Sequence, residues 1–319
     1  MEADFGFIGL GNMGFQMAGN IRKHMTASAT LYVFDIVPEA CERFIKKFGN
    51  FGPISIAHTS KEVAEKSQTV ISMVPNGGNA QEVYLDPQNG VIAATEQIDR
   101  LMLECSTIEV KVSRDIGKSV MDAGQGVYVD APVSGGTAGA EAGTLSFMVG
   151  FPPVAGADPL RRRIQDVLNF MGAPERVTFC GSLGAGLVCK TVNNYMGLSN
   201  IVTAAEGMAF GIKHGVDKMT LYKCIKSSSG DSWAMDNAQP VPGIHVKSAS
   251  TDGFRQTFAP RLCVKDVSLA LEAAKDAGTE ASMGEAALKV FQRTNDDPRT
   301  TNLDCSAVWL HVSHDVDLI

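Results

Sequence analysis

A strand that runs directly into three spaced glycines constrains this chain more than any other feature. Residues 5–14 read FGFIGLGNMG, so an apolar stretch leads into Gly9, Gly11 and Gly14 with GxGxxG spacing. Residues 16–24 continue with the spacing of a helix. A helix that starts in this way presents unpaired backbone N–H groups to an anion. The segment therefore predicts a strand, a phosphate-binding turn and a helix, as in dinucleotide-binding folds.

An acidic residue follows the second predicted strand. Residues 31–34 are apolar, and Asp35 comes next, about 20 residues after the last glycine of the turn. An acid at this position binds the ribose 2′-hydroxyl of NAD, and it repels the 2′-phosphate of NADP. The spacing therefore favours NAD over NADP as cofactor.

Strands and helices continue to alternate up to residue 181. We expect strands at 54–57, 69–74, 101–104, 127–130, 145–150 and 176–180, and helices at 60–66, 79–84, near Gln97, 112–123 and 159–171. This alternation predicts a Rossmann-type, doubly wound and mostly parallel sheet for residues 1–181. Polar or glycine-rich turns at 75–78, 106–107 and 134–136 follow the strands, at the edge where such sheets bind ligands.

A long helix is predicted from about 184 to 214, because no proline interrupts this stretch and Gly215 supplies a stop. Lys190 and Asn194 interrupt its otherwise small and apolar sequence. Residues four apart project from one face of a helix, so these two side chains can reach the same small molecule. The alternative is structural: Lys190 extends to the rim and Asn194 caps a neighbouring loop.

The pattern after Gly215 is helical, with expected helices at 217–227, 262–277, 283–294 and 303–314. Residues 182–319 are therefore expected to form an all-helical domain, with the long helix joining it to the first. Residues 227–243 are expected to form an irregular loop that carries Trp233. In this loop Trp233 is expected to form one wall of a pocket, and ordinary core packing is the alternative.

Composition excludes several other classes of function. The net charge of −7 leaves no basic stripe for nucleic acid, and no apolar run approaches the ~20 residues that span a membrane. The seven cysteines are odd in number and scattered, which predicts reduced thiols without disulfides or a structural metal. Because a strand is predicted from about Asp4, a leader peptide is not expected within these residues. The expected compartment is the mitochondrial matrix if a presequence has been removed, and the cytoplasm otherwise.

Six motifs, in order, resemble the β-hydroxyacid dehydrogenase family along nearly the whole chain. They are GFIGLGNMG, VFDIVPEACERF, DAPVSGG, CKTVNNYM, SSGDSWAMDNAQPVPG and FAPRLCVKDVSLAL. The resemblance implies that Lys190 is the catalytic lysine, Asn194 its helix partner, and Ser134, Gly135 and Gly136 the loop that binds the substrate carboxylate. Lys265 and Asp266 match the family's C-terminal Lys-Asp pair. The implied cofactor contacts are Gly9, Leu10, Gly11, Asn12, Met13, Gly14, Asp35, Val74, Pro75, Thr107, Lys265 and Asp266. Departures from the family pattern fall at Cys105, at Pro260 and Arg261, and at Gly77 and Gly78.

The resemblance implies an NAD-dependent oxidation of a small β-hydroxyacid, and the SSGDSW…PVPG loop points to 3-hydroxyisobutyrate, a substrate of valine catabolism. The cofactor takes hydride but supplies no base, so Lys190 is expected to take the hydroxyl proton. That role needs a site that lowers the pKa of the lysine from its ordinary value of ~10.4. Small residues on the long helix and the resemblance together imply a homodimer or homotetramer.

Three alternative functions remain open at this point. A related reductase could act on tartronate semialdehyde or succinic semialdehyde after a single change in the pocket. An imine reductase could share the scaffold, although enzymes of that kind usually lack the lysine found at Lys190. The third alternative is a nicotinamide-binding protein without catalysis. Relatives of that kind typically lose the catalytic lysine, so the presence of Lys190 and Asn194 argues for an enzyme.

Overall fold

A computed structural model describes residues 3–153 and 158–315. The chain divides into two compact units, Met1–Lys190 and Thr191–Ile319. The long helix α8 (Ala185–Lys213) begins in the first unit and continues into the second.

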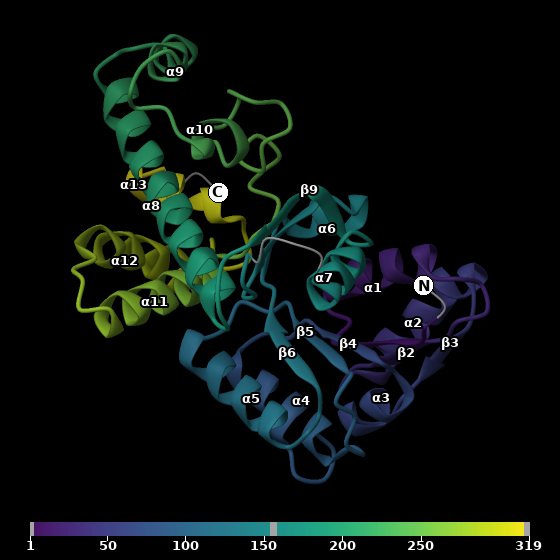
Figure 1. Ribbon diagram of the computed structural model, residues 1–319. Helices are drawn as coiled ribbons and strands as arrows, with labels where there is room; N and C mark the ends of the chain where they lie inside the picture. Colours follow the sequence, from purple (N-terminus) through teal and green to yellow (C-terminus); the bar gives the residue numbers. More distant parts are fainter. Residues whose placement is uncertain (1–2, 154–157, 316–319) are drawn as a thin grey trace. The chain divides into compact units, whose positions relative to one another are not determined.

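The first unit is built on a six-stranded parallel sheet with the order β3-β2-β1-β4-β5-β6 (Figure 1). Its strands are β1 (Phe5–Ile8), β2 (Leu31–Phe34), β3 (Ile54–Ile56), β4 (Thr69–Ser72), β5 (Leu101–Glu104) and β6 (Val127–Asp130). The predicted doubly wound sheet is therefore confirmed. The strand order reverses between β1 and β4, and sheets of this kind bind ligands beyond the carboxyl ends of the strands at that point.

Helices cover both faces of this sheet, because its strands are apolar on both sides. In β5, Leu101 and Leu103 join one buried cluster and Met102 joins the other. The first cluster is completed by α1 (Gly14–His24), α2 (Pro38–Phe48) and α7 (Pro159–Leu168). The second is completed by α3 (Ser60–Lys66), α4 (Gly77–Leu85) and α5 (Val110–Asp122). Burying one such side chain stabilises the fold by about 1.5–3 kcal/mol.

Two predicted strands belong to a second sheet instead of the first. The order in this three-stranded sheet is β7 (Val133–Ser134), β8 (Leu145–Val149) and β9 (Gly172–Phe179), with β7 and β8 antiparallel. Residues 135–144, which include α6 (Gly136–Ala142), connect β7 to β8. A parallel crossover needs about a dozen residues or more, so this short connection returns the chain in the antiparallel direction.

Local predictions were wrong at three places. Gln97 lies in no helix; the nearest helical turn is the 3₁₀ turn η2 (Val91–Ala93). The loop expected to be irregular contains α10 (Trp233–Asn237). The helix expected at 303–314 starts only at Cys305, because the extended Asp304 caps the backbone N–H of Ser306; it consists of η3 (Cys305–Ala307) followed directly by α13 (Val308–Val312).

The second unit is helical, and its described residues contain no strand. Besides α8 it contains α9 (Lys218–Lys226), α10, α11 (Pro260–Asp276), α12 (Ser282–Asp296) and α13. Leu198 and Ile201 of α8 pack with Val267 of α11 and Phe291 of α12 in one buried cluster. A second cluster contains Met208 of α8 and residues of the 233–254 segment. The all-helical second part is therefore confirmed.

Candidate active site

The turn after β1 has the geometry that a bound pyrophosphate needs. Gly9 has a φ of +92°, and a Cβ at this position would lie 2.2 Å from the carbonyl oxygen of Met73. A Cβ on Gly14 would lie 2.0 Å from the carbonyl oxygen of Gly9. At Gly11, in contrast, no atom lies within 4 Å of an added Cβ. The space beside Gly11 is therefore open, as the close approach of a dinucleotide backbone requires.

Asp35 lies directly against this turn. Its Oδ2 accepts a hydrogen bond of 2.5 Å from the backbone N–H of Leu10, and its Oδ1 accepts one of 2.8 Å from that of Val37. The glycine turn and the predicted ribose-binding acid are thus brought together at the carboxyl ends of β1 and β2.

The turns after β4 and β5 are tied together by a buried acid that the sequence analysis missed. The backbone N–H of Val74 donates a hydrogen bond of 2.7 Å to Ser106 Oγ, and the N–H of Ser106 donates one of 2.7 Å to Glu104 Oε1. Ser72 Oγ donates to Glu104 Oε2 at 2.7 Å. Glu104 therefore holds the segments next to Pro75 and Thr107, which are two of the implied cofactor contacts.

Burial raises the pKa of Glu104 to about 6, even though its hydrogen bonds to Ser106 and Ser72 lower it. Tyr84 and Tyr128 pack nearby with their rings edge to face, and burial raises the pKa of each phenol well above its ordinary value. The region beneath these turns is therefore buried. In the sequence, Glu104 could have been noticed as the acid that ends the apolar strand LMLE.

The loop at Ser134, Gly135 and Gly136 joins β7 to α6. Gly135 has a φ of +135° and Gly136 a φ of +61°, values that residues with a Cβ rarely adopt. No atom lies within 4 Å of a Cβ added to Gly136. The backbone of this loop is thus unobstructed at Gly136, as the implied carboxylate-binding role requires.

Lys190 lies near the start of α8, and only 8% of its surface is exposed. Asp130, the last residue of β6, holds this helix start: its Oδ1 accepts from the N–H of Gly184 at 2.7 Å and its Oδ2 from that of Leu187 at 2.8 Å. A Cβ on Gly186 would lie 2.1 Å from the carbonyl oxygen of Met148. A lysine amine is thus placed on a helix start fixed against β6 and β8.

In the second unit, Asn194 is oriented by Asp266. Its Nδ2 donates a hydrogen bond of 2.7 Å to Asp266 Oδ2, and Lys265 Nζ lies 3.4 Å from Asp266 Oδ1. Asp266 is buried, with 4% of its surface exposed. Asn194, Lys265 and Asp266 therefore form one polar group.

Trp233, the residue expected to form one wall of a pocket, begins α10 with 63% of its surface exposed.

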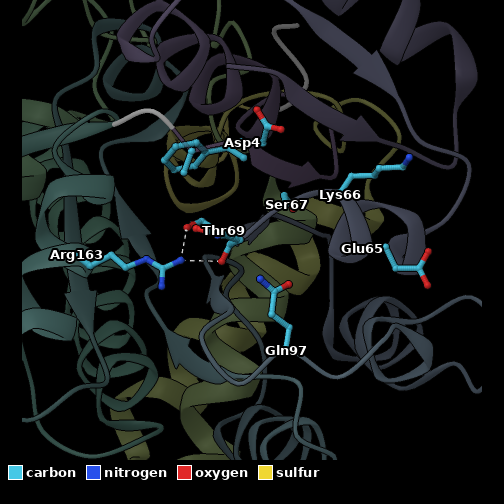
Figure 2. A pocket seen from close by; sticks show the side chains of 10 residues that line it. Asp4, Glu65, Lys66, Ser67, Thr69, Gln97 and Arg163 are labelled. Atoms are coloured by element: carbon cyan, nitrogen blue, oxygen red, sulfur yellow. Dashed lines mark hydrogen bonds between the residues drawn. The ribbon is translucent and has the colours of Figure 1, made fainter. Parts of the chain in front are cut away.

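A hollow of about 710 Å³ lies at the opposite, amino edge of the sheet, beside the starts of β1 and β4 (Figure 2). Arg163 is one of the residues that line the hollow. Its guanidinium donates hydrogen bonds to the carbonyl oxygens of Asp99 and Gln68 and to Thr69 Oγ1. The arginine thus joins segments of the fold, and none of the predicted site residues lines this hollow.

Two further kinds of feature are absent from the described part of the chain. No group of three or more histidine, cysteine, aspartate or glutamate side chains there could hold a metal ion. Nor is any helix within residues 3–153 and 158–315 long and apolar enough to cross a membrane.

Two family models together match most of the chain. Residues 4–184 match the NAD-binding domain of 6-phosphogluconate dehydrogenase. Residues 184–310 match a model described as the NAD-binding region of NADP-dependent 3-hydroxyisobutyrate dehydrogenase.

Three related proteins match this chain over 90% or more of its length. The mitochondrial 3-hydroxyisobutyrate dehydrogenase of Mus musculus is 36% identical over 287 residues, which are 90% of this chain and 80% of the relative. The NAD-dependent L-serine dehydrogenase of Pseudomonas aeruginosa is 34% identical over 286 residues, 90% of each chain. Among solved structures, Mycobacterium tuberculosis 3-hydroxyisobutyrate dehydrogenase with L-serine has a TM-score of 0.85 at 30% identity and covers 98% of this chain and 99% of its own.

The fold, the glycine turn and the relatives together show that this protein is an NAD(P)-dependent oxidoreductase that acts on a CH–OH group. The chain belongs to the β-hydroxyacid dehydrogenase family, together with these 3-hydroxyisobutyrate dehydrogenases.

Proposed function

We propose that this protein oxidises 3-hydroxyisobutyrate to methylmalonate semialdehyde with NAD, as a step of valine catabolism. The observation that carries the proposal is the buried Lys190 on a helix start fixed by Asp130, in the same unit as the glycine turn. The relatives named for this substrate support the choice of substrate.

Lys190 is the proposed general acid and base. A bound nicotinamide supplies the hydride acceptor at its C4. Lys190 Nζ takes the proton of the substrate hydroxyl during oxidation and returns it during reduction. Asn194 lies one helical turn further along α8, and Asp266 orients its amide to hydrogen-bond the hydroxyl or the lysine.

The backbone N–H groups of Ser134, Gly135 and Gly136 are proposed to bind the substrate carboxylate. Successive N–H groups in a turn with positive φ form a concave site for an anion. Lys265 and Trp233 are the proposed contributions of the second unit to substrate binding. The remaining implied cofactor contacts are the glycine turn, Val74, Pro75, Thr107, Lys265 and Asp266.

NAD is proposed over NADP because the Asp35 carboxylate lies against the glycine turn, where a 2′-phosphate would meet a negative charge. The relative that is named NAD-dependent supports this choice, whereas one matching family model is named for an NADP-dependent enzyme.

Replacement of Lys190 tests the proposed chemistry. We expect Lys190→Ala to lower kcat by about 10²–10⁴-fold, because the proton then lacks its acceptor. NADH binding, measured by fluorescence titration, should stay close to the wild-type value. Lys213→Ala removes a lysine from the exposed last turn of the same helix and is the matched control. Normal turnover of Lys190→Ala would refute the assignment.

A substrate panel tests the specificity. Reduction of NAD and NADP is followed by absorbance with (S)-3-hydroxyisobutyrate, L-serine, D-glycerate and 4-hydroxybutyrate. L-serine is the second candidate substrate, since it appears in the names of a relative and of a matching structure. Higher kcat/KM for another hydroxyacid would keep the chemistry and change the substrate. Tight NADH binding without turnover of any of them would favour a non-catalytic binding protein.

The proposed compartment is the mitochondrial matrix where a presequence is removed, and the cytoplasm otherwise. The mouse relative is named mitochondrial. Cell fractionation of the tagged full-length product distinguishes the two.

A further inference from the structure

Asn20 is a buried polar residue of α1 that joins this helix to α6. Only 5% of its surface is exposed. Its Nδ2 donates a hydrogen bond of 2.7 Å to the carbonyl oxygen of Ala140 and one of 3.4 Å to that of Glu141, which lie 120 and 121 residues further along the chain. Lys23 Nζ donates to Asn20 Oδ1 at 3.2 Å, so the amide presents its nitrogen to α6.

The two carbonyl groups belong to the last turn of α6, where a helix cannot pair its own carbonyl oxygens. The N–H groups that follow in the chain donate elsewhere. The N–H of Thr144 donates to the carbonyl oxygen of Gly139 at 3.0 Å, and the N–H of Leu145 donates to that of Met171 at 3.4 Å. The Asn20 amide therefore caps the carboxyl end of α6 from a different helix.

The two helices that Asn20 joins begin at two parts of the proposed site. Helix α1 begins at Gly14, the last glycine of the pyrophosphate turn, and Asn20 lies about 9 Å further along its axis. Helix α6 begins at Gly136, the last residue of the proposed carboxylate loop. Both helices belong to the first unit and pack against each other. Asn20 thus lies on a direct structural connection between the glycine turn and that loop.

The carboxylate loop needs support from its neighbours because it contains two consecutive glycines. Gly135 and Gly136 both have a positive φ, and glycine restricts its own backbone less than any other residue. On the side before the loop, β7 pairs Ser134 with Ser146 of β8. On the side after it, α6 follows directly, and Asn20 binds the far end of this short helix.

We propose that Asn20 is a positioning residue, which holds α6 on α1 and thereby places the carboxylate loop relative to the bound cofactor. Hydride transfer needs the substrate carbon and the nicotinamide ring in a narrow geometry, and small displacements slow such a step strongly. Asn20 acts on the reaction through the loop and touches neither cofactor nor substrate. The effect on turnover rests on the proposed function, because it requires this loop to bind the substrate carboxylate.

Two substitutions test the role of the amide. Asn20→Leu keeps a branched side chain and Asn20→Ala makes it smaller, and both remove the N–H donors. For (S)-3-hydroxyisobutyrate we expect kcat/KM to fall by about tenfold, mainly through a higher KM, because the carboxylate is bound in the ground state as well. The Kd for NADH, from fluorescence titration, should change by less than about twofold. Lys23→Ala removes the other hydrogen bond of the same amide and should leave both values unchanged.

The methyl ester of the substrate separates positioning from a general loss of structure. The ester lacks the charge that the loop is proposed to bind, and its turnover is measured at an enzyme concentration that makes the wild-type rate measurable. Loss of Asn20 should lower kcat/KM by about tenfold for the acid and by less than about twofold for the ester. Equal losses for acid and ester would mean that Asn20 only stabilises the fold. That result would overturn the proposal, as would an unchanged kcat/KM for the acid in both variants.

Hydrogen exchange tests the connection between the helices without turnover. With NADH bound, amide exchange in residues 134–144 should be faster in Asn20→Leu than in the wild type or in Lys23→Ala, because the end of α6 loses its cap. If the enzyme is inactive on every substrate, the proposed function fails, and this exchange still decides whether Asn20 holds the loop. Equal exchange in all three proteins would overturn the proposal.

Discussion

At the scale of single residues, Glu104 connects stability to pH. Its pKa is about 6 in the folded protein, whereas the ordinary pKa of a glutamate is 4.5, so the fold favours the protonated form. The stabilisation that this preference gives is complete below pH 4.5 and is lost as the pH rises through 6. The shift corresponds to about 2 kcal/mol.

The variant Glu104→Gln removes this dependence. A glutamine can accept from the Ser106 N–H and donate to Ser72 Oγ, whose hydroxyl can then donate to Tyr84. Relative to wild type, the free energy of unfolding of Glu104→Gln should therefore rise by about 2 kcal/mol between pH 4.5 and 7.5. Urea denaturation across this range measures it, with the exposed Glu82→Gln as control. A constant difference across the range would contradict the prediction.

Asp35 is expected to decide between the two cofactors. Asp35→Asn keeps the shape of the side chain and removes the charge next to the Leu10 N–H. We expect the ratio of kcat/KM for NADP to that for NAD to rise by about tenfold or more, equivalent to about 1.4 kcal/mol. Steady-state kinetics with both cofactors measures this ratio. Glu39→Gln removes a charge from the first turn of α2 and should leave the ratio unchanged; an equal effect of the two changes would argue against a local role of Asp35.

These two acids show what the sequence could and could not predict. Asp35 was predictable because its distance from the glycine turn is fixed by one helix and one strand, α1 and β2. Glu104 was not, because its bond to Ser72 spans 32 residues and its burial depends on packing from both faces of the sheet. Local spacing thus predicted the cofactor turn, while the support beneath it needed the fold.

At the scale of elements, Asp130 is the cap that fixes the start of α8. The sequence placed it in a motif, but its bonds to Gly184 and Leu187 span 54 and 57 residues, so no local pattern could reveal them. The second sheet was missed for a similar reason, since strands at 145–150 and 176–180 have the same pattern whichever sheet they join.

Removing the Asp130 cap should lower the free energy of unfolding by more than removing a cap that acts within its own helix. Asp130→Ala leaves two buried N–H groups without acceptors, and we expect the free energy of unfolding to fall by about 3 kcal/mol. Asp158 caps α7 through Leu160 and Arg161, and Asp158→Ala should cost about 1 kcal/mol. Chemical denaturation of both variants measures the difference. Equal losses would mean that Asp130 is not the main support of the helix start.

At the scale of the whole molecule, the exposed side chains of α8 support the proposed homodimer or homotetramer. Met196 and Phe210 are 58% and 65% exposed, and they lie 14 residues apart on one face of the helix. The two side chains lie about four helical turns apart, and we propose that they contact a second copy of this chain.

Phe210→Glu should therefore shift the protein towards the monomer, because a charge would be buried without a partner. Light scattering after size-exclusion chromatography measures the mass. Val246→Glu makes a similar change at an exposed residue outside the helices and is the control. A wild-type protein that is already monomeric would refute the proposed assembly.

The strand order also determines which part of the sheet can form first during translation. The central strand β1 pairs with β2 and β4, so every partner that it needs has been made once residue 72 leaves the ribosome. The glycine turn and Asp35 both belong to this first segment, whereas Lys190 is made 118 residues after residue 72. Because chains fold from the N-terminus during translation, the cofactor-binding edge of the nascent protein can form before the residue proposed for its chemistry exists.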